Sequence, residues 1–328
     1  MSSTTTPRTP VQFTHAVHPD AEAYLKSIAP SSKDIRTTRR DGMDHCCTTC
    51  LKHSREPGVV LRQCGKCKSV WYCSKECQKA DWPKHKEKCK KVDGSGILKL
   101  VDTLCANPLL QAYLQACFVL DFDLLRRPHL DSPFMARVDI AIEPADGPQF
   151  FRIFLGEELP ETKLQGMLQV NGFTPGKPAQ ISPKSMTIWR ELRDRVNADG
   201  FSRDPVGLVE YANGGTDNTF TVAMHIQSPI MEMVEKADPF PYTSAITRKI
   251  TIVPFTVEGC MEFINTQIRA DKKDQLLLRT EMRPLDIQII RDAAAGSNSV
   301  PARILNAKLA REQIYKSLLQ YVRESRSA

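Results

Sequence analysis

Eight residues of the types that bind zinc fall into four regularly spaced pairs, and this pattern constrains the fold more than any other feature of the chain. The spacing is Cys47-x2-Cys50-x13-Cys64-x2-Cys67-x5-Cys73-x3-Cys77-x7-His85-x3-Cys89. Structural zinc is held tetrahedrally by four Cys or His side chains, so eight ligands suffice for two structural Zn²⁺ ions. The segment has few apolar residues to bury, and zinc binding must therefore supply folding energy, on the order of 10 kcal/mol.

The cysteine distribution favours metal over disulfides. Eight of the eleven cysteines lie between Cys46 and Cys89. The first fifteen residues are polar and lack the apolar stretch of a secretory signal, and the charge-free stretch 103–120 contains Asn, Pro and Gln, which argues against a membrane span. We therefore expect an intracellular protein of the cytoplasm or nucleus, where thiols stay reduced. Cys105, Cys117 and Cys260 have apolar neighbours and are expected to be packing residues.

The spacing within each pair predicts local structure. The x2 pairs suit tight turns in which two thiolates converge on one ion. The x3 pairs, Cys73/Cys77 and His85/Cys89, place two ligands on one helical face. We predict two short helices, over 74–79 and 82–88, with Asp81 capping the second and Pro83 in its first turn.

Filler residues add a family resemblance. The stretches Tyr72-Cys73-Ser74 and Cys77-Gln78-x-x-Asp81-Trp82-x-x-His85-Lys86-x-x-Cys89 resemble the MYND-type zinc finger, over residues 47–89 only. MYND fingers interleave their ligand pairs. The resemblance thus implies one zinc on Cys47, Cys50, Cys73 and Cys77, and the other on Cys64, Cys67, His85 and Cys89. Spacing alone would equally allow a sequential arrangement.

Cys46 competes with Cys47 for the first ligand position. A pair beginning at Cys46 would have the spacing x3, whereas Cys47 gives the x2 spacing of the family, so we assign the ligand to Cys47.

The resemblance also implies a function for the finger. MYND fingers bind short proline-rich peptides in an extended conformation, and the Gln and Trp that frame the peptide pocket match Gln78 and Trp82. The alternative for Trp82 is a core residue of a small domain. A closed zinc site leaves no position for a catalytic water, so the finger itself is expected to be structural.

The net charge of +7 belongs to the finger rather than to the whole chain. Twelve Lys/Arg face four Asp/Glu between His45 and Lys91, so the remainder sums to about −1. Lysines such as Lys75, Lys79 and Lys86 could form a nucleic-acid patch, but such a run is typical of the solvated face of a small helix. Nucleic acid is therefore not the expected partner.

Three regions follow along the chain: a flexible N-terminal arm over 1–44 with a short helix at Ala21–Ile28, the MYND-type zinc finger over 45–91, and a larger α+β domain of unknown function over 97–328. The domain is predicted to contain helices over 97–104, 107–118, 188–196, 257–270 and 285–294, strands over 137–142, 149–155, 206–211 and 219–226, and a long terminal helix along Leu305, Leu309, Ile314, Leu318 and Val322.

We expect a non-enzymatic, zinc-binding interaction protein with an adaptor or regulatory role. The alternative is an enzyme with its active site in 97–328, for example a divergent protein lysine methyltransferase, because MYND fingers also occur within SET-domain enzymes. Those enzymes carry a Gly-rich cofactor segment before the finger and an Asn-His-Ser-Cys-like segment after it. Residues 1–44 contain only Gly42, and the chain has no Asn-His pair, so no catalytic residue is assigned.

Overall fold

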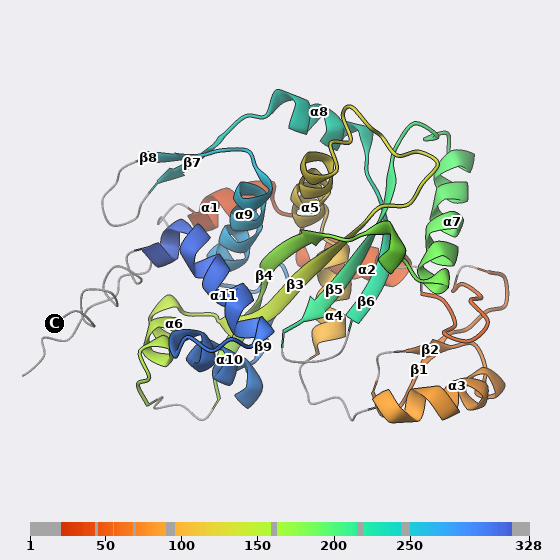
Figure 1. The fold of residues 1–328 in the computed structure, drawn as a ribbon, viewed down its shortest axis with the longest axis horizontal. Coiled ribbons are helices and arrows are strands. Elements are labelled where there is room, and N and C mark those ends of the chain that lie inside the picture. The colour runs from red at the N-terminus through yellow and green to blue at the C-terminus, as the bar shows by residue number, and fades with distance from the viewer. Residues whose placement is uncertain are drawn as a thin grey trace, which may run out of the picture.

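A five-stranded mixed sheet organises the larger domain in the computed structural model, which describes residues 21–42, 45–54, 56–67, 70–89, 96–158, 163–214, 219–243 and 250–316 (Figure 1). The strand order is β6-β5-β3-β4-β9. The bounds are β3 Met135–Pro144, β4 Gln165–Pro175, β5 Val206–Asn213, β6 Thr219–His225 and β9 Arg279–Glu281. β3 pairs with β5 in parallel, whereas the other neighbours are antiparallel.

Helices cover the sheet and its ends. Their bounds are α4 Ile97–Cys105, α5 Pro108–Asp121, α6 Gly147–Phe154, α7 Pro183–Ala198, α8 Ser228–Lys236, α9 Val257–Ala270, α10 Pro284–Ala294 and α11 Val300–Arg311, with a short 3-10 turn at Pro178–Gln180. A separate hairpin joins β7 Phe240–Thr243 to β8 Ile250–Val253. Among the described residues no single helix is long and apolar enough to span a membrane; α4 and α5 meet the length and composition criteria together, but an 82° bend separates them.

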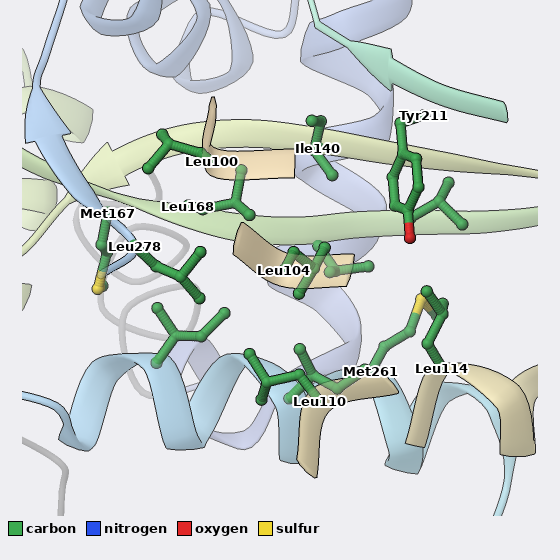
Figure 2. Packing of buried hydrophobic residues seen from close by; sticks show 14 of the residues in the cluster. Leu100, Leu104, Leu110, Leu114, Ile140, Met167, Leu168, Tyr211, Met261 and Leu278 are labelled. Carbon is green, nitrogen blue, oxygen red and sulfur yellow. The ribbon is translucent and has the colours of Figure 1, made fainter. Parts of the chain in front are cut away.

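Two apolar clusters hold helices against opposite faces of the sheet. Successive strand residues point to opposite faces. Val209 and Tyr211 of β5 join the main core, where α4, α5 and α9 pack (Figure 2). Leu208 of β5 joins a smaller cluster built around Trp189 of α7. The Trp189 indole also donates to the Val206 carbonyl at 2.7 Å, which fixes α7 on that face.

Most predicted helices are confirmed. Asn107 caps α5 as expected: its side chain accepts a hydrogen bond from the Leu110 amide, and Pro108 occupies the first turn. The strand predicted over 137–142 and the hairpin predicted from 206–211 and 219–226 are also present, the latter as the antiparallel pair β5–β6. The turn of this hairpin at 215–218 lies outside the described residues.

The strand predicted over 149–155 was wrong, because the segment forms α6. The alternation of Phe151, Ile153 and Leu155 suggested a strand. Phe150, Phe151, Ile153 and Phe154 are all buried, which is the i, i+1, i+3, i+4 pattern of a helix, and Pro148 lies in the first turn.

The long terminal helix is interrupted at Glu312. This residue adopts an extended conformation, with ψ 134°, and its buried carboxylate accepts a hydrogen bond from Asn265 of α9 at 2.6 Å. Helical geometry resumes at 313–316, while Leu318 and Val322 lie outside the described residues.

The region expected as a flexible arm divides into two parts. Residues 1–20 lie outside the described residues. Residues 21–42 form the expected helix α1 Ala21–Ile28 and a further helix, α2 Ser32–Gly42. Leu25 and Ile35 are buried in the main core, so this part of the segment is packed against the larger domain.

Candidate zinc centre and contact surface of the finger

A hairpin and one helix build the finger. β1 Arg62–Gln63 pairs antiparallel with β2 Trp71–Tyr72, and α3 runs over Lys75–Lys88. Cys64 follows β1 directly and Cys73 follows β2, and the amide of Cys64 donates to the carbonyl of Val70 at 2.9 Å. The antiparallel hairpin therefore places the first residues of these two ligand pairs at its opposite ends.

The two short helices predicted around Pro83 are a single helix. Ser74, not Asp81, occupies the N-cap, and its hydroxyl accepts from the Cys77 amide. Asp81 instead accepts a hydrogen bond from the Tyr72 hydroxyl at 2.7 Å. Pro83 lies inside α3, where it lacks the amide for one intrahelical bond but does not break the helix.

Ligand atoms converge in two groups, each within 4.8 Å: Cys47, Cys50, Cys73 and Cys77 form one, and Cys64, Cys67, His85 and Cys89 form the other. These are the interleaved sets that the family resemblance implied, rather than sequential ones. Cys46 is in neither group; it forms a β-bridge with His53.

The separations within each group fit zinc. Tetrahedral Zn–S bonds of about 2.3 Å put neighbouring sulfurs about 3.8 Å apart, and a sulfur and an imidazole nitrogen slightly closer. The Sγ atoms of Cys50 and Cys73 lie 3.5 Å apart, and those of Cys64 and Cys89 lie 3.8 Å apart. His85 Nε2 lies 3.4 Å from the Sγ of Cys67 and 3.4 Å from that of Cys64. Four-ligand Cys₄ and Cys₃His sets are those of closed structural zinc sites, and the finger thus provides two.

In each ligand group, one cysteine has a pKa below that of an ordinary thiol. Burial alone would raise the pKa of Cys47, but backbone hydrogen bonds from Cys50 and Cys73 lower it to about 6. Burial also tends to raise the pKa of Cys64, but hydrogen bonds from the Cys67 backbone and the His85 side chain lower it to about 6. Because zinc binds the thiolate, both effects favour metal binding near neutral pH.

Gln78 and Trp82 share a face of α3, one helical turn apart. The Trp82 side chain is 42% exposed, and its ring centroid lies 5.9 Å from that of the zinc-ligand candidate His85. Trp82 is absent from the buried cluster of the finger, which consists of four cysteines and Tyr72. The tryptophan is therefore at the surface rather than in the core.

The finger contacts the larger domain through residues that the sequence did not single out. Nε2 of His53 contacts Oε2 of Glu191 in α7, and the rings of His45 and Trp71 stack with centroids 4.3 Å apart on this side of the finger. Figure 1 shows the finger beside the lower end of α7. No local spacing could reveal this contact, since its two residues are 138 positions apart.

Comparisons with known protein families match the finger and the larger domain separately. The model of the MYND finger matches residues 47–89, and that of a domain of unknown function, DUF8205, matches residues 92–315. No solved structure matches the chain significantly.

Curated relatives match mainly around the finger. The SET domain and MYND-type zinc finger protein 6 of Schizosaccharomyces pombe is 36% identical over 89 residues, 27% of this chain and 17% of the relative. The N-lysine methyltransferase SMYD2-A of Danio rerio is 44% identical over 55 residues, or 17% and 11%. The zinc finger MYND domain-containing protein 10 homolog of Drosophila melanogaster is 44% identical over 60 residues, or 18% and 12%. The chain thus spans less than a fifth of each.

Proposed function

The chain belongs to the DUF8205 family and carries a MYND finger, and we propose that it is a zinc-dependent adaptor whose finger binds peptide segments of partner proteins. The observation that carries this proposal is the exposed Trp82 on a helix that supplies ligands to both zinc groups.

Zinc fixes the position of α3 and hence of the contact surface. Cys77 belongs to the first ligand group, whereas His85 and Cys89, at the end of the helix, belong to the second. The hydroxyl of Thr49, which lies between the ligands Cys47 and Cys50, also donates a hydrogen bond to the Cys77 carbonyl at 2.7 Å. A helix held at both ends loses little conformational entropy when a peptide binds, which favours affinity.

The two residues of the surface suit an extended peptide. An exposed indole offers a large apolar contact area and favours the rigid rings of proline. The amide of Gln78 can donate to a peptide carbonyl and accept from a peptide amide. We therefore take proline-rich segments as the preferred ligand class, and a cytoplasmic or nuclear location, where thiols stay reduced, belongs to the same proposal.

The enzyme alternative gains no support from the methyltransferase relatives. The matches to SMYD2-A and the other SMYD2 proteins each cover 17% of this chain or less. Two groups of side chains in the larger domain also lack the arrangement of a nucleophilic active site. Burial raises the pKa of Cys105 to about 12, so this residue is a thiol at neutral pH. Ser228 donates to Asp204 rather than to His225, which contacts the other carboxylate oxygen.

The test is a titration of the full-length, zinc-loaded protein with a panel of fluorescein-labelled proline-rich decapeptides. We expect Trp82→Ala to weaken the tightest of these interactions by about tenfold or more, as removal of a central aromatic anchor does. Val60→Ala is the matched control, because Val60 is another apolar finger residue and is 66% exposed. Equal binding by the wild type and Trp82→Ala would refute the assigned surface.

A further inference from the structure

A cavity of about 770 Å³ lies between the finger and the larger domain and follows one strand over its whole length. Every residue of β6, from Thr219 to His225, lines it, whereas β5 contributes only Val209 and Tyr211. Seven residues of a strand span roughly 20 Å at about 3.3 Å each. The cavity is therefore a groove along β6, too long for a single ion.

The strand in this groove has a free edge. β6 is the last strand on its side of the sheet and pairs only with β5. Among the described residues, no backbone group outside β5 is hydrogen-bonded to residues 219–225; beyond the strand, the amide of Ile226 donates to the Pro205 carbonyl. Residues of both faces of β6 line the cavity, so the groove runs along the edge itself, where alternate amide and carbonyl groups face outward.

The two walls of the groove differ in chemistry. Phe220 and Val222 pack with the main core, on the face covered by α4 and α5, and Val101 and Ala112 of these helices line that wall. By strand alternation, Thr219, Thr221, Ala223 and His225 face α7.

The α7 wall carries more positive than negative charge toward the groove. Lys184 and Arg195 line it, together with Glu191, whose carboxylate contacts His53 of the finger. Asp102, the acidic residue among the α4 and α5 positions of the lining, is on the opposite wall. An added strand with acidic side chains toward α7 and apolar ones toward α4 and α5 would match both walls.

We propose that the free edge of β6 binds an extended partner peptide in which apolar and acidic residues alternate. Main-chain hydrogen bonds to β6 supply affinity, and the two walls select alternate side chains. The finger contributes His45, His53 and Trp71 to the lining of the groove. This site is separate from Gln78 and Trp82, neither of which lines the cavity.

The test uses an acetylated, fluorescein-labelled octapeptide of alternating valine and glutamate, titrated into the full-length, zinc-loaded Trp82→Ala protein so that the finger surface does not contribute. We expect saturable binding, slower amide exchange in 219–225 on binding, and binding weaker by about tenfold or more for the valine–lysine octapeptide.

N-methylation tests the backbone pairing. In an added strand only every second peptide amide faces β6. N-methylating one alternate set should therefore weaken binding by about tenfold or more, while methylating the other set should leave it nearly unchanged. Equal effects of both sets would overturn strand addition.

Charge reversal tests the α7 wall. Lys184→Glu should weaken binding of the valine–glutamate octapeptide, whereas Arg190→Glu, on the same helix but outside the lining, should not. Lys184 is exposed, so its replacement leaves the core intact. No saturable binding of the octapeptide, or a dimer in which 219–225 is protected without peptide, would overturn the proposal; the second result would assign the edge to another copy of the chain.

Discussion

Lys308 of α11 donates a hydrogen bond from Nζ to Oε1 of Glu143 in β3 at 2.6 Å, and both side chains are buried. Asn171 accepts a second bond from the same ammonium at 3.0 Å, and the Tyr315 hydroxyl donates to the other Glu143 oxygen at 2.9 Å. This buried network joins the last described helices to the sheet. Its charges are paired, which is the condition under which burial of ions is tolerated.

Removing one member of the pair should be strongly destabilising. Lys308→Met leaves Glu143 buried without its cation, and we expect a loss of about 3–5 kcal/mol in the free energy of unfolding. Urea denaturation measures it, with Lys272→Met, at an exposed lysine, as the control. The double variant Glu143→Leu/Lys308→Met should recover much of the loss, because no unpaired charge remains. A single variant as stable as the wild type would contradict the role of the pair.

Asp102 should make stability fall as pH rises. Burial raises its pKa from 3.8 to about 6, against a smaller opposing effect of Arg39. Well below pH 4 the carboxyl is protonated in both states and costs nothing. Between about pH 4 and pH 6 it ionises in the unfolded chain but not in the folded protein, so stability falls across this window and up to about 3 kcal/mol is lost above pH 6.

Asp102→Asn removes this titration. The variant should therefore be more stable than the wild type at pH 7, and the difference should shrink to near zero at about pH 3, below the unfolded pKa. Urea denaturation of both proteins across this range measures the difference, with Asp199→Asn at an exposed site as the control. A difference that does not change with pH would show that Asp102 does not ionise as described.

Removal of zinc should unfold the finger and spare the larger domain. The buried cluster of the finger consists of Cys47, Cys64, Cys67, Cys89 and Tyr72, so four of its five members are candidate ligands and little apolar surface remains without metal. The larger domain has its own extensive core. After chelation, hydrogen exchange should become fast over 45–89 and remain slow in β3 and β5. Loss of protection throughout the sheet would contradict this independence.

The zinc-ligand pairs and the cap of α5 could be predicted because both depend on residues close in sequence, whereas the cap predicted at Asp81 was wrong. Ligand pairs and the Asn107–Pro108 start of α5 are of this kind. β4 was missed because its buried residues include Gln169 and Asn171, which interrupt the apolar pattern of a central strand. Their burial depends on Lys308, which donates to both and is more than 130 positions away.

The β6 groove could not be predicted from the sequence either, because it also depends on residues that are far apart in the chain. Its free edge follows from the order of strands in the sheet, and its walls come from α4, α5, α7 and the finger. The interleaved ligand sets were available only from the family resemblance, since the count of ligands fits two pairings. The structure decides between them, because the Sγ atom of Cys50 lies 3.5 Å from that of Cys73 and the Sγ atom of Cys64 lies 3.8 Å from that of Cys89.

Zinc stoichiometry by native mass spectrometry tests the interleaved finger most directly. The full-length wild type and Cys46→Ser should each hold two zinc ions. Cys47→Ser/Cys73→Ser, with both changes in one ligand group, should retain one ion, whereas Cys47→Ser/Cys64→Ser, with one change in each group, should retain none. The opposite result, no zinc in the first double variant and one in the second, would show sequential sites and contradict the structure of the finger.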